Sequence, residues 1–140
     1  MRGGAAVTVL TSARPEIGSK PLKALMVFLT AVRHRVDAAV AYHGGDTEKY
    51  LGEVDGLHAS LLMHLGEEDE FISKRAQAEI KTALAGKTNA TVCSYPGQYH
   101  AFSRHNGAHY NAVAAVLANS RTSELLHQQL RCPLRQPSGR

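Results

Sequence analysis

Three short apolar runs, each closed by glycine or by Pro-Gly, constrain the fold more than any other feature of this 140-residue sequence. They are Val36–Tyr42, followed by Gly44-Gly45, then Leu61–Leu65, followed by Gly66, and Thr91–Tyr95, followed by Pro96-Gly97. Continuous apolar runs of this length are typical of strands buried on both faces, as in parallel sheets. The pattern therefore predicts an α/β protein whose helices cover both faces of a parallel sheet.

Helical patterns fill most of the remaining sequence. Pro21 suits the first turn of a helix that carries an apolar stripe and ends at Arg33-His34-Arg35. A second helix is predicted over Ser73–Ala85, capped by Ser73, and a third over His109–Leu130. For the third helix, the inner face is predicted to hold Val113, Leu117, Leu125 and Leu130. Residues 5–10 alternate weakly and could add a fourth strand, while residues 43–60 predict an irregular crossover.

Charge and composition exclude several classes of protein. The net charge is +4, but the basic residues are scattered and no basic stripe carries interleaved aromatic residues, so a nucleic-acid partner is not expected. The longest apolar run, Ala24–Val32, is too short to span a bilayer, and no membrane partner is expected. Cys93 falls in a predicted strand and Cys132 beyond the last helix, which argues against a disulfide. With a poor secretory signal at the start, a cytoplasmic location is expected.

Two polar residues follow successive predicted strands. Asp69 comes shortly after Leu61–Leu65, and His100 comes shortly after Thr91–Tyr95. Because parallel strands end at one edge of the sheet, the two side chains are expected to lie close together. A carboxylate there can accept the ring N–H of the histidine and stabilise the imidazolium that forms when it acts as a base. Taken singly, each residue also fits a plainer interpretation, a solvated acid before a helix and a loop histidine.

Four segments of the chain together resemble the C-terminal part of the dienelactone hydrolase family, a branch of the α/β-hydrolases. They are VDAAVAYHG at 36–44, LGEED at 65–69, YPGQYHAF at 95–102 and ANSRT at 118–122. The resemblance implies a partial α/β-hydrolase fold with three or four parallel strands flanked by helices. It also implies hydrolysis of small ester or lactone substrates by a Cys-His-Asp triad, with no metal and no cofactor. Asp69 then matches the acid, His100 the base, and Arg104 the arginine that binds the substrate carboxylate.

The resemblance breaks at the nucleophile. The family carries it on an elbow of the type Gly-x-Cys-x-Gly-Gly, and here the matching position is Pro21, with Lys23 and Ala24 in place of the glycines. Ser19 lies two positions away without the elbow pattern. The chain accordingly divides into an atypical segment over residues 1–21, the family-like part over 22–131, and a flexible tail over 132–140. Little or no esterase turnover is expected from it.

Two alternatives remain open beside a hydrolase. One is an inactive, truncated remnant that binds a small carboxylate or self-associates through an exposed sheet edge. The other is a metal protein that uses His100, His105 and His109, although the turn-forming Asn106-Gly107 between them argues against a shared helical face. No metal site is therefore predicted. The remaining histidines are interpreted as ordinary solvated or half-buried residues: His34, His43, His58, His64 and His127.

Overall fold

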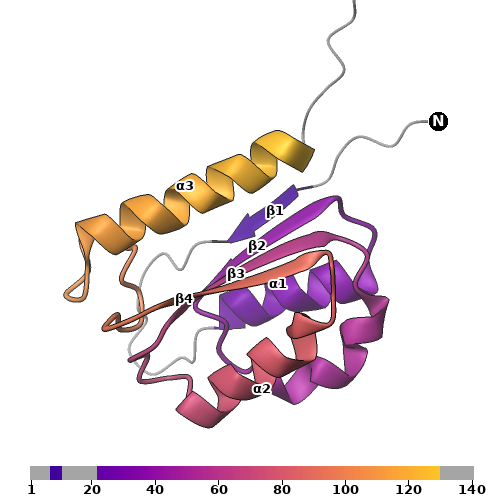
Figure 1. The fold of residues 1–140 in the computed structure, drawn as a ribbon, viewed down its shortest axis with the longest axis horizontal. Coiled ribbons are helices and arrows are strands. Elements are labelled where there is room, and N and C mark those ends of the chain that lie inside the picture. Colours follow the sequence, from indigo (N-terminus) through magenta and orange to yellow (C-terminus); the bar gives the residue numbers. More distant parts are fainter. Residues whose placement is uncertain (1–6, 11–21, 130–140) are drawn as a thin grey trace, which may run out of the picture.

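A four-stranded parallel sheet organises the computed structural model, which describes residues 7–10 and 22–129 (Figure 1). The strands lie side by side in chain order: β1 (Val7–Leu10), β2 (Ala38–Tyr42), β3 (Ser60–Gly66) and β4 (Ala90–Tyr95). All three neighbouring pairs are parallel, with Val40 opposite Leu62 and Leu62 opposite Thr91. The predicted α/β fold is confirmed, and the weakly alternating segment near the start supplies the fourth strand.

The two central strands are the most deeply buried. Every residue of β2 is buried, and in β3 only Ser60 is partly exposed. In β4 the first five residues are half-buried or exposed and Tyr95 alone is buried, because this strand lies at the end of the strand order. Continuous apolar sequence thus marks the centre of the sheet more faithfully than its margin.

Helices cover the sheet in two unequal layers. On one face lie α1 (Leu22–Arg33), α2 (Lys74–Ala85) and, in the crossover between β2 and β3, the 3₁₀ segment η1 (Thr47–Gly56) (Figure 1). Their apolar side chains form the larger core with inward residues of β2 and β3, including Val27, Phe28, Met63, Leu65 and Ile80. On the opposite face, α3 (Ala112–Gln129) is the one helix among the described residues, and it packs over a smaller cluster. None of the helices in the described ranges is long and apolar enough to cross a membrane.

Helix α2 matches its predicted range closely. Ser73 caps it, with its side-chain oxygen accepting a hydrogen bond from the Ala76 N–H at 3.1 Å. By contrast, α3 begins at Ala112, three residues after the predicted start, because the Asn111 side chain caps it by accepting from the Ala114 N–H at 3.0 Å.

The predicted inner face of α3 was largely wrong. Val113 and Leu117 are 81% and 44% exposed, and the buried face instead carries Ala114, Ala118 and Thr122. Small side chains let the helix approach the aromatic rings of the sheet, which fill the space that leucine or valine would otherwise occupy. Leu125 does pack against this cluster, and Leu130 lies outside the described residues.

A buried polar network also joins α3 to the sheet. His64 on β3 is fully buried, and its ring nitrogens lie 2.8 Å from the Tyr95 hydroxyl and 2.9 Å from the Thr122 hydroxyl. The Tyr42 hydroxyl donates to Asn119 Oδ1 at 2.8 Å. Buried hydrogen bonds are strongly directional, so this network fixes how α3 sits on β2, β3 and β4. The interpretation of His64 as solvated or half-buried was wrong.

Candidate functional site

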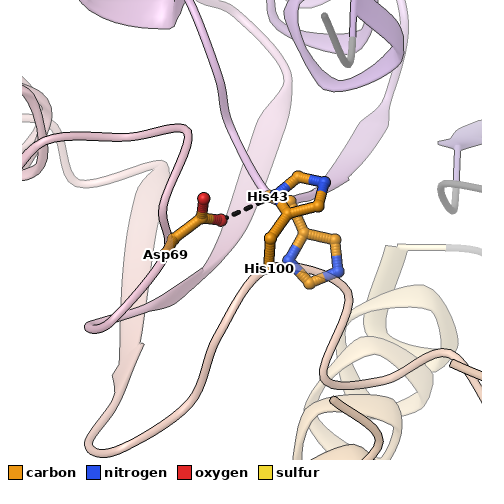
Figure 2. A group of neighbouring side chains, drawn as sticks. All are labelled: His43, Asp69 and His100. Atoms are coloured by element: carbon orange, nitrogen blue, oxygen red, sulfur yellow. Dashed lines mark hydrogen bonds and ion pairs between the residues drawn. The ribbon is translucent and has the colours of Figure 1, made fainter. Parts of the chain in front are cut away.

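Three strand ends meet at one edge of the sheet and carry the candidate site. His43 directly follows β2, Asp69 lies in the turn after β3, and His100 lies in the loop after β4. Figure 2 shows the three side chains converging, with the two imidazole rings next to each other. This position, beyond the carboxyl ends of parallel strands, is where ligands bind in open α/β sheets.

Asp69 and His100 form a directed pair. Asp69 Oδ2 lies 2.8 Å from His100 Nδ1, and the Asp69 side chain is fully buried while that of His100 is 12% exposed. The other carboxylate oxygen, Oδ1, accepts the Phe71 N–H at 2.8 Å, which fixes the orientation of the carboxylate. The Phe71 ring meets the imidazole edge-on, with ring centroids 4.8 Å apart. A histidine held through Nδ1 in this way presents its second nitrogen, Nε2, for proton transfer.

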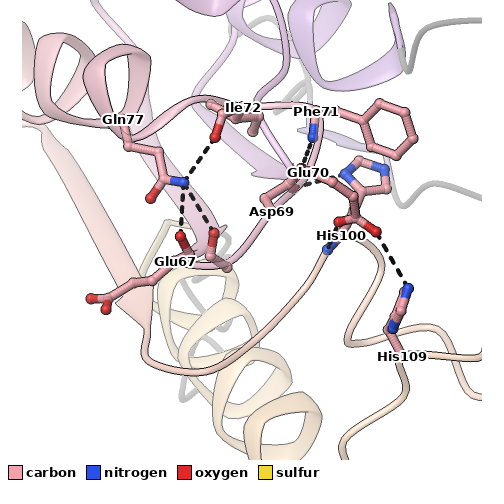
Figure 3. A network of polar contacts seen from close by, with 9 residues as sticks. Glu67, Asp69, Glu70, Phe71, Ile72, Gln77, His100 and His109 are labelled. Atoms are coloured by element: carbon pink, nitrogen blue, oxygen red, sulfur yellow. Dashed lines mark hydrogen bonds and ion pairs between the residues drawn. The ribbon is translucent and has the colours of Figure 1, made fainter.

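The two loops that carry the pair are tied together by polar contacts (Figure 3). Glu70 accepts the His100 backbone N–H at 3.0 Å and lies 3.3 Å from His109 Nε2. Behind the turn, the buried Gln77 amide donates to the carbonyls of Gly66 and Ile72 at 3.3 and 3.1 Å. These bonds hold the Asp69 turn against both α2 and the His100 loop, so the pair does not rely on its own hydrogen bond for alignment.

Gly66 lets the two loops approach each other. A Cβ atom at this position would lie 2.5 Å from the Gln98 carbonyl oxygen and 3.0 Å from that of Tyr99, both in the backbone that leads to His100. We expect Gly66→Ala to lower the free energy of unfolding by roughly 1–3 kcal/mol in urea denaturation, because backbone atoms have to move. Gly52→Ala is the matched control, since a Cβ there meets nothing within 4 Å. Equal stability of the two variants would contradict the packing described.

His43 is the site residue that sequence reasoning missed. Its interpretation as an ordinary solvated or half-buried histidine was wrong: it is 1% exposed, and its ring centroid lies 4.7 Å from that of His100. Its backbone is in the left-handed region, with φ at 63°, and its Nδ1 is buried without a hydrogen-bond partner. Burial, reinforced by the neighbouring His100 and opposed by Asp69, lowers the pKa of His43 to about 3. The ring is therefore uncharged at neutral pH.

The other candidates named from the sequence are less closely joined to the pair. Arg104 lies on the same loop as His100 and is half-buried, and nowhere in the described ranges does its guanidinium make a hydrogen bond or ion pair. His105 contacts Asn106 and His109 contacts Glu70, so these two do not gather around His100. The metal cluster considered for His100, His105 and His109 is not formed.

The position matched to the nucleophile lies outside the described residues. Ser19 and Pro21 lie outside the described residues, as does Cys132. Ala24, which stands in place of the second elbow glycine, is buried in α1. Cys93 lies inside β4 and packs against the cluster beneath α3. Within the described ranges, no hydrogen bond joins His100 to a serine or cysteine side chain.

Comparison with known proteins identifies the family. The family model described as the dienelactone hydrolase family matches residues 23–130, which is most of the chain. The chain belongs to the dienelactone hydrolase family. That range includes all three members of the site and the whole of β2, β3 and β4.

The chain is also similar in sequence to individual members of the dienelactone hydrolase family. A protein of Azospirillum brasilense, provisionally named a carboxymethylenebutenolidase, is 36% identical over 129 residues, covering 92% of this chain and 55% of that protein. The carboxymethylenebutenolidase of Pseudomonas putida is 33% identical over 101 residues, covering 72% of this chain and 43% of that protein.

Solved structures support the same fold. A crystal structure from Klebsiella pneumoniae subsp. pneumoniae, titled provisionally as a dienelactone hydrolase, superposes with a TM-score of 0.66 at 22% identity. The superposition covers 76% of this chain and 49% of that one. The chain thus spans about half the length of the relatives that it matches.

Proposed function

We propose that this chain carries the acid–base half of an ester or lactone hydrolase, with His100 as base and Asp69 as its orienting acid. The observation that carries the proposal is the 2.8 Å contact between Asp69 Oδ2 and His100 Nδ1 at the carboxyl edge of the sheet. A buried carboxylate on Nδ1 holds the imidazole with Nε2 free to accept a proton and stabilises the resulting imidazolium. Membership of the dienelactone hydrolase family supports the reaction class.

The proposed reaction uses water where the family uses a thiolate, because the resemblance to the family places Pro21 at the nucleophile position. His100 accepts a proton from the water as its oxygen attacks the substrate carbonyl, and returns the proton to the departing alkoxide. General-base assistance of this kind contributes about 10²–10⁴-fold. Without a covalent intermediate, we expect turnover to be low, so the assay requires micromolar protein and an activated ester.

We expect His100→Ala to lower the rate of hydrolysis of a chromogenic short-chain ester, above the buffer rate, by about a hundredfold. His105→Ala is the matched control, since His105 is an exposed histidine of the same loop that contacts Asn106. Equal rates for wild type and His100→Ala would refute the proposed base. Rapid turnover that His100→Ala abolishes would instead reveal a nucleophile, with Ser19 the first to replace.

Arg104 is proposed to bind a carboxylate on the substrate. A guanidinium matches a carboxylate through two parallel hydrogen bonds, and Arg104 lies four residues after His100 on the same loop. We expect Arg104→Ala to raise KM about tenfold for an ester that bears a carboxylate, because one charge-assisted hydrogen bond to the substrate is lost. The KM for a neutral ester should stay unchanged. Equal changes for both esters would argue for a structural role.

A second candidate function is self-association of a non-catalytic domain that binds small carboxylates. The supporting observation is the outward face of α3, where Val113, Val116 and Leu117 are 81%, 63% and 44% exposed. Contiguous exposed apolar side chains favour contact with another surface. We expect light scattering to give a mass above the 15.1 kDa of one chain. In Val116→Lys the measured mass should fall toward that of the monomer. A monomer at all concentrations would exclude this candidate.

A further inference from the structure

We infer that Glu70 is a positioning residue for the proposed base, holding the backbone of His100 so that the imidazole meets Asp69 in a single tautomer. Glu70 Oε2 accepts the His100 backbone N–H at 3.0 Å, and Asp69 Oδ2 lies 2.8 Å from Nδ1 of the same histidine (Figure 3). Two successive acidic residues thus hold His100 at two points, its backbone and its ring. The inference rests on the proposed function, in which His100 is the base, and adds a residue to which that function gives no role.

The Glu70 carboxylate is itself held by a second contact with the same loop. Its other oxygen, Oε1, lies 3.3 Å from His109 Nε2. The His109 ring stacks on Tyr99, the residue before His100, with centroids 4.9 Å apart and 25° between the ring planes. Contacts on both oxygens restrict the rotation of the carboxylate, so Oε2 stays directed at the His100 N–H.

The backbone beside His100 is strained and has few other anchors. Ala101, the next residue, has φ at 59°, and a non-glycine residue keeps such a conformation only where its surroundings hold it. Among the backbone groups of residues 99–101, the His100 N–H is the one that bonds outside the loop to another described residue. The nearest anchors on either side are the Gln98 carbonyl, which is hydrogen-bonded to the turn after β3, and the buried Phe102. Loss of that one bond frees the segment that carries the imidazole.

The charge of Glu70 strengthens this bond. Partial burial raises the pKa of Glu70, but the backbone N–H groups of Glu70 itself and of His100, together with the neighbouring His109, bring that pKa below its ordinary range. The side chain is therefore an ionised carboxylate at neutral pH. A hydrogen bond to an ionised acceptor is roughly twice as strong as one between neutral groups. The His100 N–H is thus held by a stronger acceptor than a backbone carbonyl would be.

Nitrogen NMR of the full-length chain with isotopically labelled histidine reads the tautomer of His100, which is assigned by difference from His100→Ala. We expect one neutral tautomer in wild type, with the proton on Nδ1 toward Asp69, and a mixture of both tautomers in Glu70→Ala. Glu70→Met keeps the length of the side chain without an oxygen. It should behave as Glu70→Ala does, and it decides the matter if Glu70→Ala does not fold. Glu70→Gln, whose amide oxygen can accept the same N–H, should restore the wild-type spectrum.

Rates of ester hydrolysis above background give the second readout. Glu70→Ala and Glu70→Met should lower kcat about tenfold or more with KM unchanged, because a misplacement of about 1 Å can cost roughly a hundredfold. Glu70→Gln should keep most of the rate. Glu68→Ala is the matched control and should equal wild type in spectrum and rate, since the Glu68 carboxylate pairs with Lys74 at 2.9 Å and not with the His100 loop.

A wild-type tautomer in folded Glu70→Ala or Glu70→Met, or an equal change in Glu68→Ala, would overturn the inference. So would a Glu70→Gln variant that loses the tautomer as fully as Glu70→Ala does. A role confined to stability would leave the tautomer and kcat of the folded variants unchanged. Because the spectrum is recorded on the resting chain, a Glu70-dependent tautomer without ester hydrolysis would reject only the proposed hydrolysis. Hydrolysis through His100 with the tautomer unchanged in the Glu70 variants would reject only the positioning role.

Discussion

Lowering the pH from 7 to 4 is expected to remove on the order of 3 kcal/mol from the free energy of unfolding through His64 alone. Burial between the sheet and α3, with a smaller contribution from the nearby Arg121, lowers the pKa of His64 to about 4. The unfolded chain binds the proton near pH 6.5, and the folded chain resists it until about pH 4. The stability is therefore fully present above pH 6.5 and is lost as the pH falls toward 4.

The contacts of His64 explain why it resists protonation. Its two nitrogens face the hydroxyls of Tyr95 and Thr122, its ring packs on Tyr42, and the Arg121 guanidinium donates to the Tyr95 hydroxyl at 3.2 Å. No carboxylate in the described ranges bonds to the ring to offset a positive charge.

Urea unfolding between pH 7 and pH 4 measures the effect. His64→Gln should flatten the dependence relative to wild type, and His105→Ala should leave it unchanged. Identical slopes for wild type and His64→Gln would contradict the assignment.

Asp69→Asn is expected to reduce ester hydrolysis above background by about a hundredfold or more, although the change is nearly isosteric. The Phe71 N–H donates to Oδ1, so the amide oxygen of asparagine occupies that position and its NH₂ group faces His100 Nδ1. The imidazole then has to carry its proton on Nε2, where it can no longer act as a base. Circular dichroism checks that the fold is retained, and an unchanged rate would show that Asp69 does not set the tautomer.

The central part of the sheet could be predicted from the sequence because two strands are buried on both faces. The runs at Val36–Tyr42 and Leu61–Leu65 differ from β2 and β3 by no more than two residues at either end. The inner face of α3 could not be predicted in this way. Its apolar periodicity selected Val113 and Leu117, whereas packing against the tyrosine rings of the sheet favoured alanine and threonine. Complementary shape across two elements is not visible in the periodicity of one.

Part of the candidate site could also be predicted from the sequence. Asp69 and His100 were found because each follows an apolar run that ends at the same edge. His43 directly follows the remaining run, Val36–Tyr42, so the rule that selected the other two also indicated it. The sequence alone nevertheless favours an ordinary solvated or half-buried histidine at this position. Its burial and its left-handed backbone, with φ at 63°, are features that no sequence pattern specifies.

The central claim, that Asp69 and His100 act as one unit in hydrolysis, is tested most directly by a double-mutant cycle. The rate of ester hydrolysis above background is measured for wild type, Asp69→Asn, His100→Ala and the double variant. The account predicts that each single change lowers the rate about a hundredfold and that the double variant is no slower than either, because residues of one unit are not additive. A His100→Ala variant as fast as wild type, or losses that multiply in the double variant, would contradict it.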